Sequence, residues 1–398
     1  MNVLHLCTKV PFPAKDGGAL AIMSFARLLQ MNGHSVTILA ANTVKHFQTE
    51  VIGEIDGITL KAVNIQTSVS LPRLIGNLFF SKIPYNISRF RNDAFAAELK
   101  NLLSQNSYDV IQLEGPHMGI YFSEIRRYSK AKIVLRAHNV EHLLWEDIKS
   151  ETSSFIRRFY LSILVNRLRT FEKELITNVD AVVSITENDL QVINKFSKPV
   201  HCCAIPFGID QAQYHKPAEG EENSLFFIGA LDWLPNQKGL IWFLEQVWPK
   251  LKKACPEVHF HVAGRNAPVW LAERQQSQNI NFCGEIDDAG DFLSKFQVQI
   301  VPLFSGSGIR IKILEGMAMG KAIVATSKAV EGIGITPGKE LMIADDADAF
   351  MLAIKDLLTH KNKRNSIGTE ARAFISKEFD NLALANKVGS FYRSLIPV

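Results

Sequence analysis

The stretch from Val301 to Thr326 constrains the fold of this chain more than any other. It reads V-P-L-F-S-G-S-G-I-R-I-K-I-L-E-G-M-A-M-G-K-A-I-V-A-T. The apolar run that ends at Pro302 predicts a buried parallel strand, residues 305–308 predict a turn, and residues 309–319 predict a helix that Gly320 closes. A strand, glycine loop and helix in this order expose unpaired backbone N–H groups at the positive end of a helix dipole, where a phosphate group fits.

Three charged side chains of this helix lie outside its apolar stripe. Gly308, Lys312 and Glu315 are spaced i, i+4 and i+7, so they share one face that leads up to the loop. Together with Arg310 they supply two cations and a carboxylate, which suit a diphosphate and a ribose diol respectively. The alternative is that Lys312 and Glu315 form an exposed ion pair worth about 0.3 kcal/mol.

At these residues the chain resembles the retaining glycosyltransferases of family 4, which are two-domain enzymes that use nucleotide sugars. One branch of that family has the signature G-S-G-x-R-x-K-x-L-E-G-M-A-x-G. Glu315 falls on the second acid of the family's Glu-x7-Glu motif, whereas Ser307 stands where the first acid is expected. The resemblance implies a donor site built from this loop and helix, namely Ser307, Gly308, Ile309, Arg310, Lys312 and Glu315.

A second strand, loop and helix unit precedes this one and contains Lys238, which we expect just before its helix. A cation at the positive end of a helix indicates an anion nearby. The resemblance makes Lys238 the family's diphosphate lysine, whereas Ala230 replaces an arginine that many members have. We expect Arg310 to supply that charge, so that Lys238 and Arg310 stabilise the leaving diphosphate. By the same resemblance, the backbone of Ile286 is expected to hold the base.

The N-terminal half opens with a strand predicted at residues 3–7, a helix that ends at Met31, and a strand predicted at residues 35–40. This order predicts a parallel doubly wound domain. The loop after the first strand contains Gly17 and Gly18. The pair either forms an ordinary turn or, as the resemblance implies, belongs to the family's N-terminal glycine loop at the donor site.

The segment R-A-H-N-V-E-H follows a strand predicted at residues 132–136. A lone histidine is usually structural, but this segment gathers four polar side chains at the mouth of a parallel sheet, Arg136, His138, Glu141 and His142. It resembles the H-N-V-E-H segment of the same glycosyltransferase branch, which places His138 beside the transferred sugar as a catalytic residue. Glu114 and His117, which end and follow the preceding strand, are secondary candidates.

These patterns and the resemblance predict an α/β protein with two facing Rossmann-like, doubly wound parallel-sheet domains and a deep inter-domain cleft, the glycosyltransferase B type. A chain of 398 residues is too long for one ordinary core. We expect an acceptor-binding domain at residues 1–205, a nucleotide-sugar-binding domain at 206–378, and a terminal helix at 379–398 that crosses back to the first domain.

The resemblance implies transfer of a sugar from a UDP- or GDP-linked donor to a saccharide or lipid-linked acceptor, in cell-surface polysaccharide or glycoconjugate synthesis. No cofactor or metal is expected, since Asp346 and Asp348 precede a helix, where aspartates cap, and the five cysteines are scattered. Two alternatives stay open. One is a nucleotide-sugar epimerase, and the other is a non-catalytic subunit that binds nucleotide sugars.

Residues 71–91 mix aromatic and basic side chains without a clean helical period, so they form either part of a helical layer or an acceptor or membrane-surface segment. Residues 1–200 carry 23 Lys and Arg against 18 Asp and Glu, which favours an anionic membrane or an anionic acceptor. No charged leader or membrane-length apolar run is found, so we expect a cytoplasmic protein, peripheral to the inner face of the membrane, with no nucleic-acid partner. Residues 145–178 predict one long helix whose arginines, including Arg167, are solvated.

Overall fold

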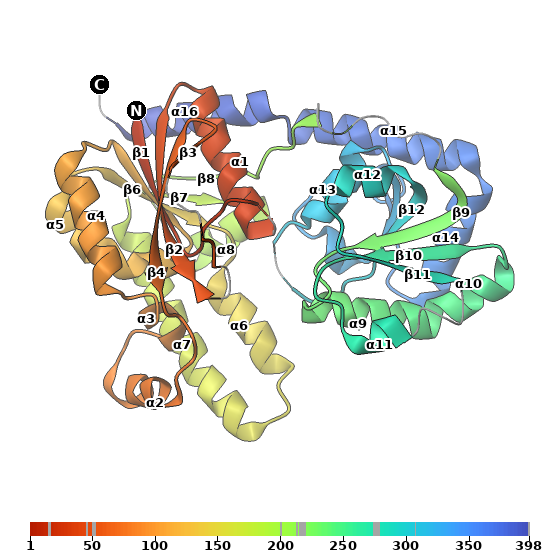
Figure 1. The fold of residues 1–398 in the computed structure, drawn as a ribbon, viewed down its shortest axis with the longest axis horizontal. Coiled ribbons are helices and arrows are strands. Elements are labelled where there is room, and N and C mark those ends of the chain that lie inside the picture. The colour runs from red at the N-terminus through yellow and green to blue at the C-terminus, as the bar shows by residue number, and fades with distance from the viewer. Residues whose placement is uncertain are drawn as a thin grey trace. The chain divides into compact units, whose positions relative to one another are not determined.

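The computed structural model describes residues 1–14, 17–44, 47–49, 53–199, 201–211, 214, 220–273, 279–306 and 308–396. The chain forms two compact units, one containing Met1–Gly208 and the C-terminal segment from Leu382, the other containing Ile209–Asn381 (Figure 1). Each unit is a parallel sheet covered by helices, which confirms the predicted fold class of two Rossmann-like domains. In the described part of the chain, no helix combines the length and the apolar character that a membrane crossing requires.

Unit 1 is built on an eight-stranded sheet in the order β3-β4-β2-β1-β5-β6-β7-β8. The strands are β1 (Asn2–Cys7), β2 (Ser35–Thr43), β3 (Gly53–Ile55), β4 (Ile58–Ile65), β5 (Val110–Glu114), β6 (Lys132–Ala137), β7 (Ala181–Ser184) and β8 (Cys202–Ala204). Only the pairing of β3 with β4 is antiparallel among those described. Because the sheet is parallel, the carboxyl ends of β1, β5 and β6 meet at one edge.

Helices cover both faces of this sheet. They are α1 (Gly17–Met31), α2 (Leu71–Phe80), α3 (Tyr85–Ser88), α4 (Asp93–Gln105), α5 (Phe122–Tyr128), α6 (Glu141–Ser150), α7 (Phe155–Asn178), α8 (Glu187–Phe196) and α16 (Asn381–Leu395), with a 3-10 turn at Pro116–Tyr121. Val3 of β1 packs in a cluster with residues of α1 and α16, whereas its neighbour Leu4 packs with residues of α4. Alternate residues of one strand thus enter two cores, which explains its continuous apolar sequence.

The long helix expected at residues 145–178 is wrong, because α6 and α7 form a hairpin of two helices (Figure 1). The break falls at the polar run that ends in Ser154, whose side chain accepts a hydrogen bond from the Arg157 N–H and so caps α7. Arg167 is also not a solvated residue. Its guanidinium donates to the backbone carbonyls of Asn77 at 3.1 Å and Leu78 at 2.7 Å, at the end of α2.

Unit 2 has a six-stranded parallel sheet in the order β11-β10-β9-β12-β13-β14. Its strands are β9 (Glu221–Ile228), β10 (His259–Ala263), β11 (Ile280–Gly284), β12 (Phe296–Val301), β13 (Ala322–Ala325) and β14 (Met342–Ile343). Its α-helices are α9 (Leu234–Trp242), α10 (Trp248–Ala254), α11 (Val269–Glu273), α12 (Ala289–Ser294), α13 (Ile311–Ala318), α14 (Ala347–Thr359) and α15 (Lys361–Glu378).

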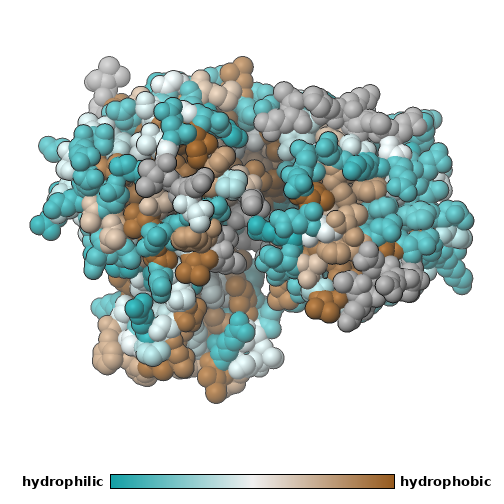
Figure 2. Space-filling view, viewed as in Figure 1, coloured by the Kyte–Doolittle hydropathy of each residue, from teal (hydrophilic) through white to brown (hydrophobic). Residues whose placement is uncertain are grey.

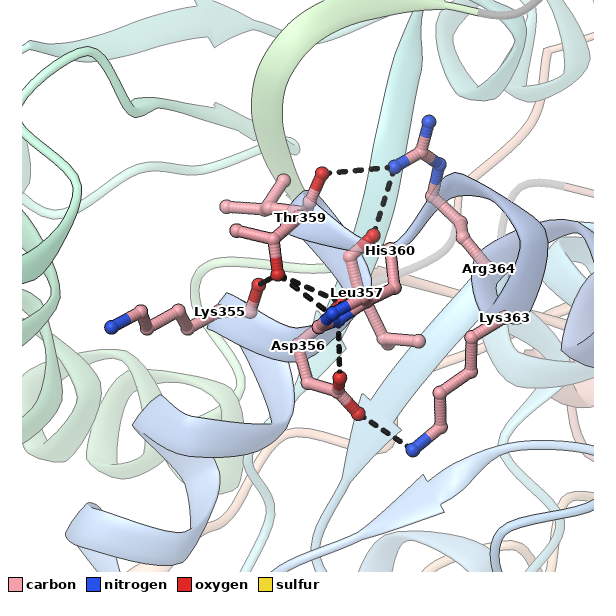
Figure 3. A network of polar contacts seen from close by, with 8 residues as sticks. Lys355, Asp356, Leu357, Thr359, His360, Lys363 and Arg364 are labelled. Atoms are coloured by element: carbon pink, nitrogen blue, oxygen red, sulfur yellow. Dashed lines mark hydrogen bonds and ion pairs between the residues drawn. The ribbon is translucent and has the colours of Figure 1, made fainter.

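A polar network joins α14 to α15 (Figure 3). The carboxylate of Asp356 accepts a hydrogen bond from Lys363 at 2.6 Å and lies 2.7 Å from the His360 ring, while Arg364 donates to the Leu357 carbonyl at 2.8 Å. These bonds satisfy groups at the end of one helix and hold the start of the next. At the other end of α14, Asp346 caps the helix by accepting from the backbone N–H groups of residues 348 and 349. Asp346 therefore caps this helix, as the sequence predicts.

Candidate active site

The loop at residues 302–310 joins β12 to α13 and is called the donor loop, because the sequence predicts donor binding there. Gly306 and Gly308 have φ angles of +97° and +80°, a conformation that favours glycine. The helix starts at Ile311, two residues later than expected, because Arg310 is an extended N-cap residue with φ −86° and ψ 96°. Ser307 lies outside the described residues. Ile309 therefore belongs to the loop, next to the open N-terminus of α13.

Lys312 points away from Glu315 and toward β9. Its ammonium group donates to the Asn236 side-chain oxygen at 2.8 Å and lies 4.1 Å from the centroid of the Phe227 ring. Asn236 is buried and donates in turn to the Ala230 carbonyl at 2.8 Å. The surface ion pair considered from the sequence is therefore wrong, since Lys312 and Glu315 have separate partners. Asn236 was not predicted from the sequence, where its nearness to Lys238 is the signal that could have indicated it.

Two cations crowd the N-terminus of α13. Burial, together with the charge of Arg310, lowers the pKa of Lys312 to about 7. Burial also lowers the pKa of Arg310 to about 10; its guanidinium donates to the Gly308 carbonyl at 2.6 Å and lies 5.6 Å from the Trp233 ring. Arg310 is buried and Lys312 is half-buried. Two basic groups that repel each other beside a positive helix end are stabilised by a bound anion.

This arrangement predicts proton uptake on binding. At pH 8 most of the free protein carries a neutral Lys312, whose pKa is about 7. A bound diphosphate stabilises the ammonium form and raises that pKa, so binding at pH 8 should take up close to one proton and weaken as the pH rises further. Calorimetry of UDP binding in buffers of different ionisation enthalpy measures the uptake. Uridine, which lacks phosphate, and the Lys312→Met variant should show none; equal uptake with uridine would contradict the assignment.

Glu315 lies one turn further along α13. Its Oε1 accepts a hydrogen bond from the Tyr214 hydroxyl at 3.2 Å. Burial raises the pKa of Glu315, and the charge of Asp288 acts in the same direction, while the bond from Tyr214 partly opposes them. Tyr214 was missed because nothing in the sequence links two residues 101 positions apart.

Lys238 is exposed and is the fifth residue of α9, so the expected position just before the helix is wrong. The helix begins earlier because Pro235 occupies its first turn, where proline is favoured. Gly239, the next residue, packs so closely that a Cβ atom there would lie 1.7 Å from the Pro302 carbonyl oxygen. Lys238 therefore lies next to the start of the donor loop.

Ile286 follows β11 and is half-buried. It packs against an aromatic cluster that includes Phe226 and Phe296, and Tyr214 packs against the same cluster. The side chain thus has a packing role, and the contact of its backbone with a base stays a prediction.

In unit 1, Glu114 and His138 meet at the carboxyl ends of β5 and β6. The His138 Nε2 lies 2.6 Å from Glu114 Oε2, and His5 Nδ1 of β1 lies 3.3 Å from the other carboxylate oxygen. The Arg136 guanidinium is 3.8 Å from the same carboxylate. Glu114 is buried, whereas the His138 side chain is 20% exposed, so the imidazole is the member of the pair that reaches solvent.

The protonation states of the pair follow from its surroundings. Burial alone would raise the pKa of Glu114, but the hydrogen bonds from His138 and His5 and the charge of Arg136 bring it well below its ordinary value. Burial lowers the pKa of His138 despite the opposing effect of Glu114. At neutral pH an ionised Glu114 therefore accepts from Nε2–H of a neutral His138, and this leaves Nδ1 as an acceptor for a sugar hydroxyl.

The other polar residues of the R-A-H-N-V-E-H segment have different roles. Arg136 is fully buried, donates to the Ala21 carbonyl at 2.8 Å and packs on Phe25. His142 is bound by Glu172 at 2.6 Å. The expectation that all four residues gather for substrate is therefore wrong for these two, which hold α1 and α7 in place.

Glu141 faces the 3-10 turn after β5. Its carboxylate lies 3.6 Å from His117 Nε2, and its backbone N–H donates to Glu172 at 2.8 Å. Burial, together with the charge of Glu172, raises the pKa of Glu141 to about 7. Burial lowers the pKa of His117 to about 4. A protonated carboxyl and a neutral imidazole are both suited to hydrogen bonds with a saccharide.

Gly17 and Gly18 form the first turn of α1, so the loop expected there is wrong for this pair. Arg136 bonds to Ala21 in the next turn, which ties this end of α1 to β6 beside the Glu114 and His138 pair.

Comparison with known families shows to which class of enzyme this chain belongs. The model described as "Glycosyltransferase Family 4" matches residues 15–213, and the one described as "Glycosyl transferases group 1" matches residues 222–360. The chain belongs to glycosyltransferase family 4. It is therefore a glycosyltransferase that uses a nucleotide-sugar donor, and the matches do not support the epimerase or the non-catalytic subunit.

Solved structures share the glycosyltransferase B fold of this family-4 enzyme. Sucrose-phosphate synthase from Thermosynechococcus elongatus is 16% identical, with a TM-score of 0.75 and 99% of each chain covered. HepE from Anabaena in complex with UDP is 14% identical, with a TM-score of 0.69 and 99% and 100% covered. An uncharacterized 44.6 kDa protein in the cps region of Klebsiella pneumoniae is 24% identical over 96% of this chain and 97% of its own length.

Proposed function

We propose that this glycosyltransferase transfers a sugar from a UDP-linked donor, with retained anomeric configuration, to a saccharide or lipid-linked acceptor in cell-surface polysaccharide synthesis. The observation that carries the proposal is the pair of basic side chains at the N-terminus of α13, the buried Arg310 and the half-buried Lys312. UDP is favoured over GDP because HepE has been solved with UDP and with UDP-glucose. The Klebsiella relative encoded in a cps region favours polysaccharide synthesis.

In this proposal the nucleotide binds to unit 2. The carboxylate of Glu315 accepts from the ribose hydroxyls, the backbone of Ile286 contacts the base, and the diphosphate lies against the donor loop, including Ser307, Gly308 and Ile309. As the glycosidic bond breaks, negative charge grows on the diphosphate, and Lys238, Arg310 and Lys312 stabilise it. Nothing in the proposal requires a metal.

Unit 1 binds the acceptor in this proposal, and its His138 contacts the transferred sugar through Nδ1. Gly17 and Gly18 supply backbone N–H groups near the donor. Ser307 replaces the first acid of the family motif, so we assign no carboxylate nucleophile. Retention then follows from attack of the acceptor hydroxyl on the face that the diphosphate leaves.

A melting-shift screen with UDP-, GDP- and ADP-sugars tests the donor. A ligand at 100 times its dissociation constant stabilises the fold by about 2.7 kcal/mol, so the correct base should give the largest shift. Product analysis with UDP-glucose and a saccharide acceptor then tests transfer. Donor binding without transfer to any acceptor would contradict an active enzyme.

The basic residues give a prediction about transfer rate. Lys238→Ala and Arg310→Ala should each lower the rate of transfer by roughly 10-fold or more and leave uridine binding nearly unchanged, because their partner is charge that grows in the transition state. Single-turnover kinetics and calorimetry separate the two effects. Lys253→Ala removes an exposed lysine elsewhere in unit 2 and should change neither. Equal losses in uridine binding and rate would place these residues outside the diphosphate site.

We also propose a cytoplasmic enzyme that contacts the anionic inner face of the membrane through unit 1. Helix α2 buries none of its residues, so it does not belong to the helical layer of the core. Its Phe80 is 92% exposed, and Phe155 at the start of α7 is 84% exposed. Figure 2 shows hydrophobic residues gathered at the lower end of unit 1, where Figure 1 places α2 and the end of the α6–α7 hairpin. Exposed Lys82, Arg157 and Arg158 complement anionic lipid.

Sedimentation with vesicles tests this contact. The protein should pellet with phosphatidylserine-containing vesicles at low salt and less at high salt, since charges are screened within ~10 Å at 0.1 M. The double variant Phe155→Ser and Ile156→Ser should weaken binding by roughly 10-fold or more, because two large apolar side chains no longer insert. Leu352→Ser, at an exposed apolar position of unit 2, is the matched control. Pelleting that is absent or indifferent to salt would contradict the membrane contact.

A further inference from the structure

Unit 1 contains a polar pocket that the donor chemistry does not use. It has a volume of about 670 Å³ and lies beyond the carboxyl end of β4, between the segment before α2, the end of α3 and the start of α4. Every lining residue that the structure describes has a polar side chain. The residues that matter for its chemistry are Ser68, Arg73, Ser88, Arg89, Arg91 and Asp93.

The charges of the pocket are unbalanced, since its described lining contains three arginines and one aspartate. Arg91 is paired with Glu124 outside the lining. Arg73 is exposed and makes no hydrogen bond or ion pair with any residue that the structure describes. Arg89 donates to the Thr67 carbonyl at 3.5 Å, and its buried Nε has no hydrogen-bond partner within the described ranges. An unpartnered buried donor is costly, so this guanidinium is poised for an acceptor that the protein does not supply.

Arg89 also connects the pocket to the groups that follow β5 and β6. The charge of Arg89 contributes to the lowered pKa of His117 and partly opposes the rise in the pKa of Glu141. Those two side chains are 3.6 Å apart, and Glu141 is three residues after His138. A ligand in the pocket would therefore lie on the same side of unit 1 as the histidine proposed to contact the transferred sugar.

We propose that this pocket binds an oxyanion, a carboxylate or a phosphate, carried by the acceptor saccharide. The inference rests on the proposed function, since it names the chemical class of that acceptor. Guanidinium groups bind carboxylate and phosphate through paired hydrogen bonds, and the hydroxyls of Ser68 and Ser88 suit neighbouring sugar hydroxyls. A neutral acceptor would leave both Arg73 and the Nε of Arg89 without a partner.

The test is calorimetric titration of the full chain with glucuronate, inorganic phosphate and glucose. UDP-glucose is titrated first, and its failure to bind would count against the proposed function alone. The anions are then titrated with UDP present, so that phosphate does not enter the donor loop. We expect at least one of the two anions to bind and glucose not to bind. Binding of glucuronate alone identifies a carboxylate as the acceptor group, binding of phosphate alone identifies a phosphate, and binding of both means that either group is accepted. Equal binding of glucose, or no binding of either anion, overturns the proposal.

Variants place the binding in the pocket. Arg73→Ala should weaken binding of the anion by roughly 10-fold or more, the loss expected for a charged hydrogen bond. Arg89→Lys keeps the charge but loses the Nε donor and should weaken it as well. Arg127→Ala removes an exposed arginine of unit 1 outside the pocket and should have no effect. Melting temperatures check folding, and anion affinity unchanged in folded Arg73→Ala and Arg89→Lys overturns the proposal.

Discussion

Replacing His138 with alanine is expected to lower turnover by roughly 100- to 1,000-fold, the loss typical of a group that contacts the reacting centre. Donor affinity should change little, because the nucleotide is proposed to bind to unit 2. The measurements are single-turnover transfer from UDP-glucose and calorimetric binding of UDP. His201→Ala removes an exposed histidine of unit 1 and serves as the control. Unchanged turnover in a folded His138→Ala enzyme would remove the histidine from the site.

The pH profile separates this role from a structural one. Burial lowers the pKa of His138, so the neutral ring that we propose to accept a hydrogen bond persists below the ordinary pKa of histidine. Turnover should therefore fall on the acid side only once the pH drops through this lowered pKa. In Glu114→Gln the charge that holds the Nε2–H tautomer is lost, so turnover should fall while UDP binding is kept. A profile identical to wild type in Glu114→Gln would contradict the coupling.

Replacing Glu315 with glutamine is expected to weaken UDP binding by about 1.5–3 kcal/mol, or roughly 10- to 150-fold, if the carboxylate accepts from the ribose hydroxyls. The melting temperature of the free enzyme should change little, because Glu315 forms no ion pair with a described residue and glutamine can still accept from Tyr214. Calorimetry with uridine and UDP should show the same loss for both, since the ribose is common to them. A loss confined to UDP would place Glu315 at the phosphates instead.

Tyr214→Phe is the matched control for this prediction. It removes the hydrogen bond to Glu315 Oε1 but keeps the carboxylate. Binding should therefore fall by less than in Glu315→Gln, and the pKa of Glu315 should rise further because the bond that lowers it is gone. At acidic pH the affinity of this variant should fall earlier than that of the wild type, as the carboxylate protonates through its raised pKa. Losses as large as in Glu315→Gln would mean that Tyr214, and not the carboxylate, binds the nucleotide.

The polar residues of the candidate site show how much of it can be predicted from the sequence alone. The sequence placed Lys312, Glu315 and His138 next to strand ends, because the order of strand, loop and helix fixes where such residues lie. It did not provide their partners. Asn236 is 76 residues from Lys312, and Glu114 is 24 residues from His138. Arg136 and His142 have the same polar character as His138, yet they are buried in contacts with α1 and α7.

The sequence by itself determined the two doubly wound units and the family, because apolar runs, glycines and helix stops act over a few residues and need no distant partner. The strands β1 and β6 accordingly begin and end within one residue of their predicted ranges, 3–7 and 132–136. Only the tertiary structure decided that Lys312 turns toward Asn236, that α6 and α7 form a hairpin, and that Arg89 keeps an unused donor in a basic pocket. The physical reason is that burial and pairing depend on neighbours brought together by the sheet, and these neighbours set both the pKa values and the hydrogen bonds left for a ligand.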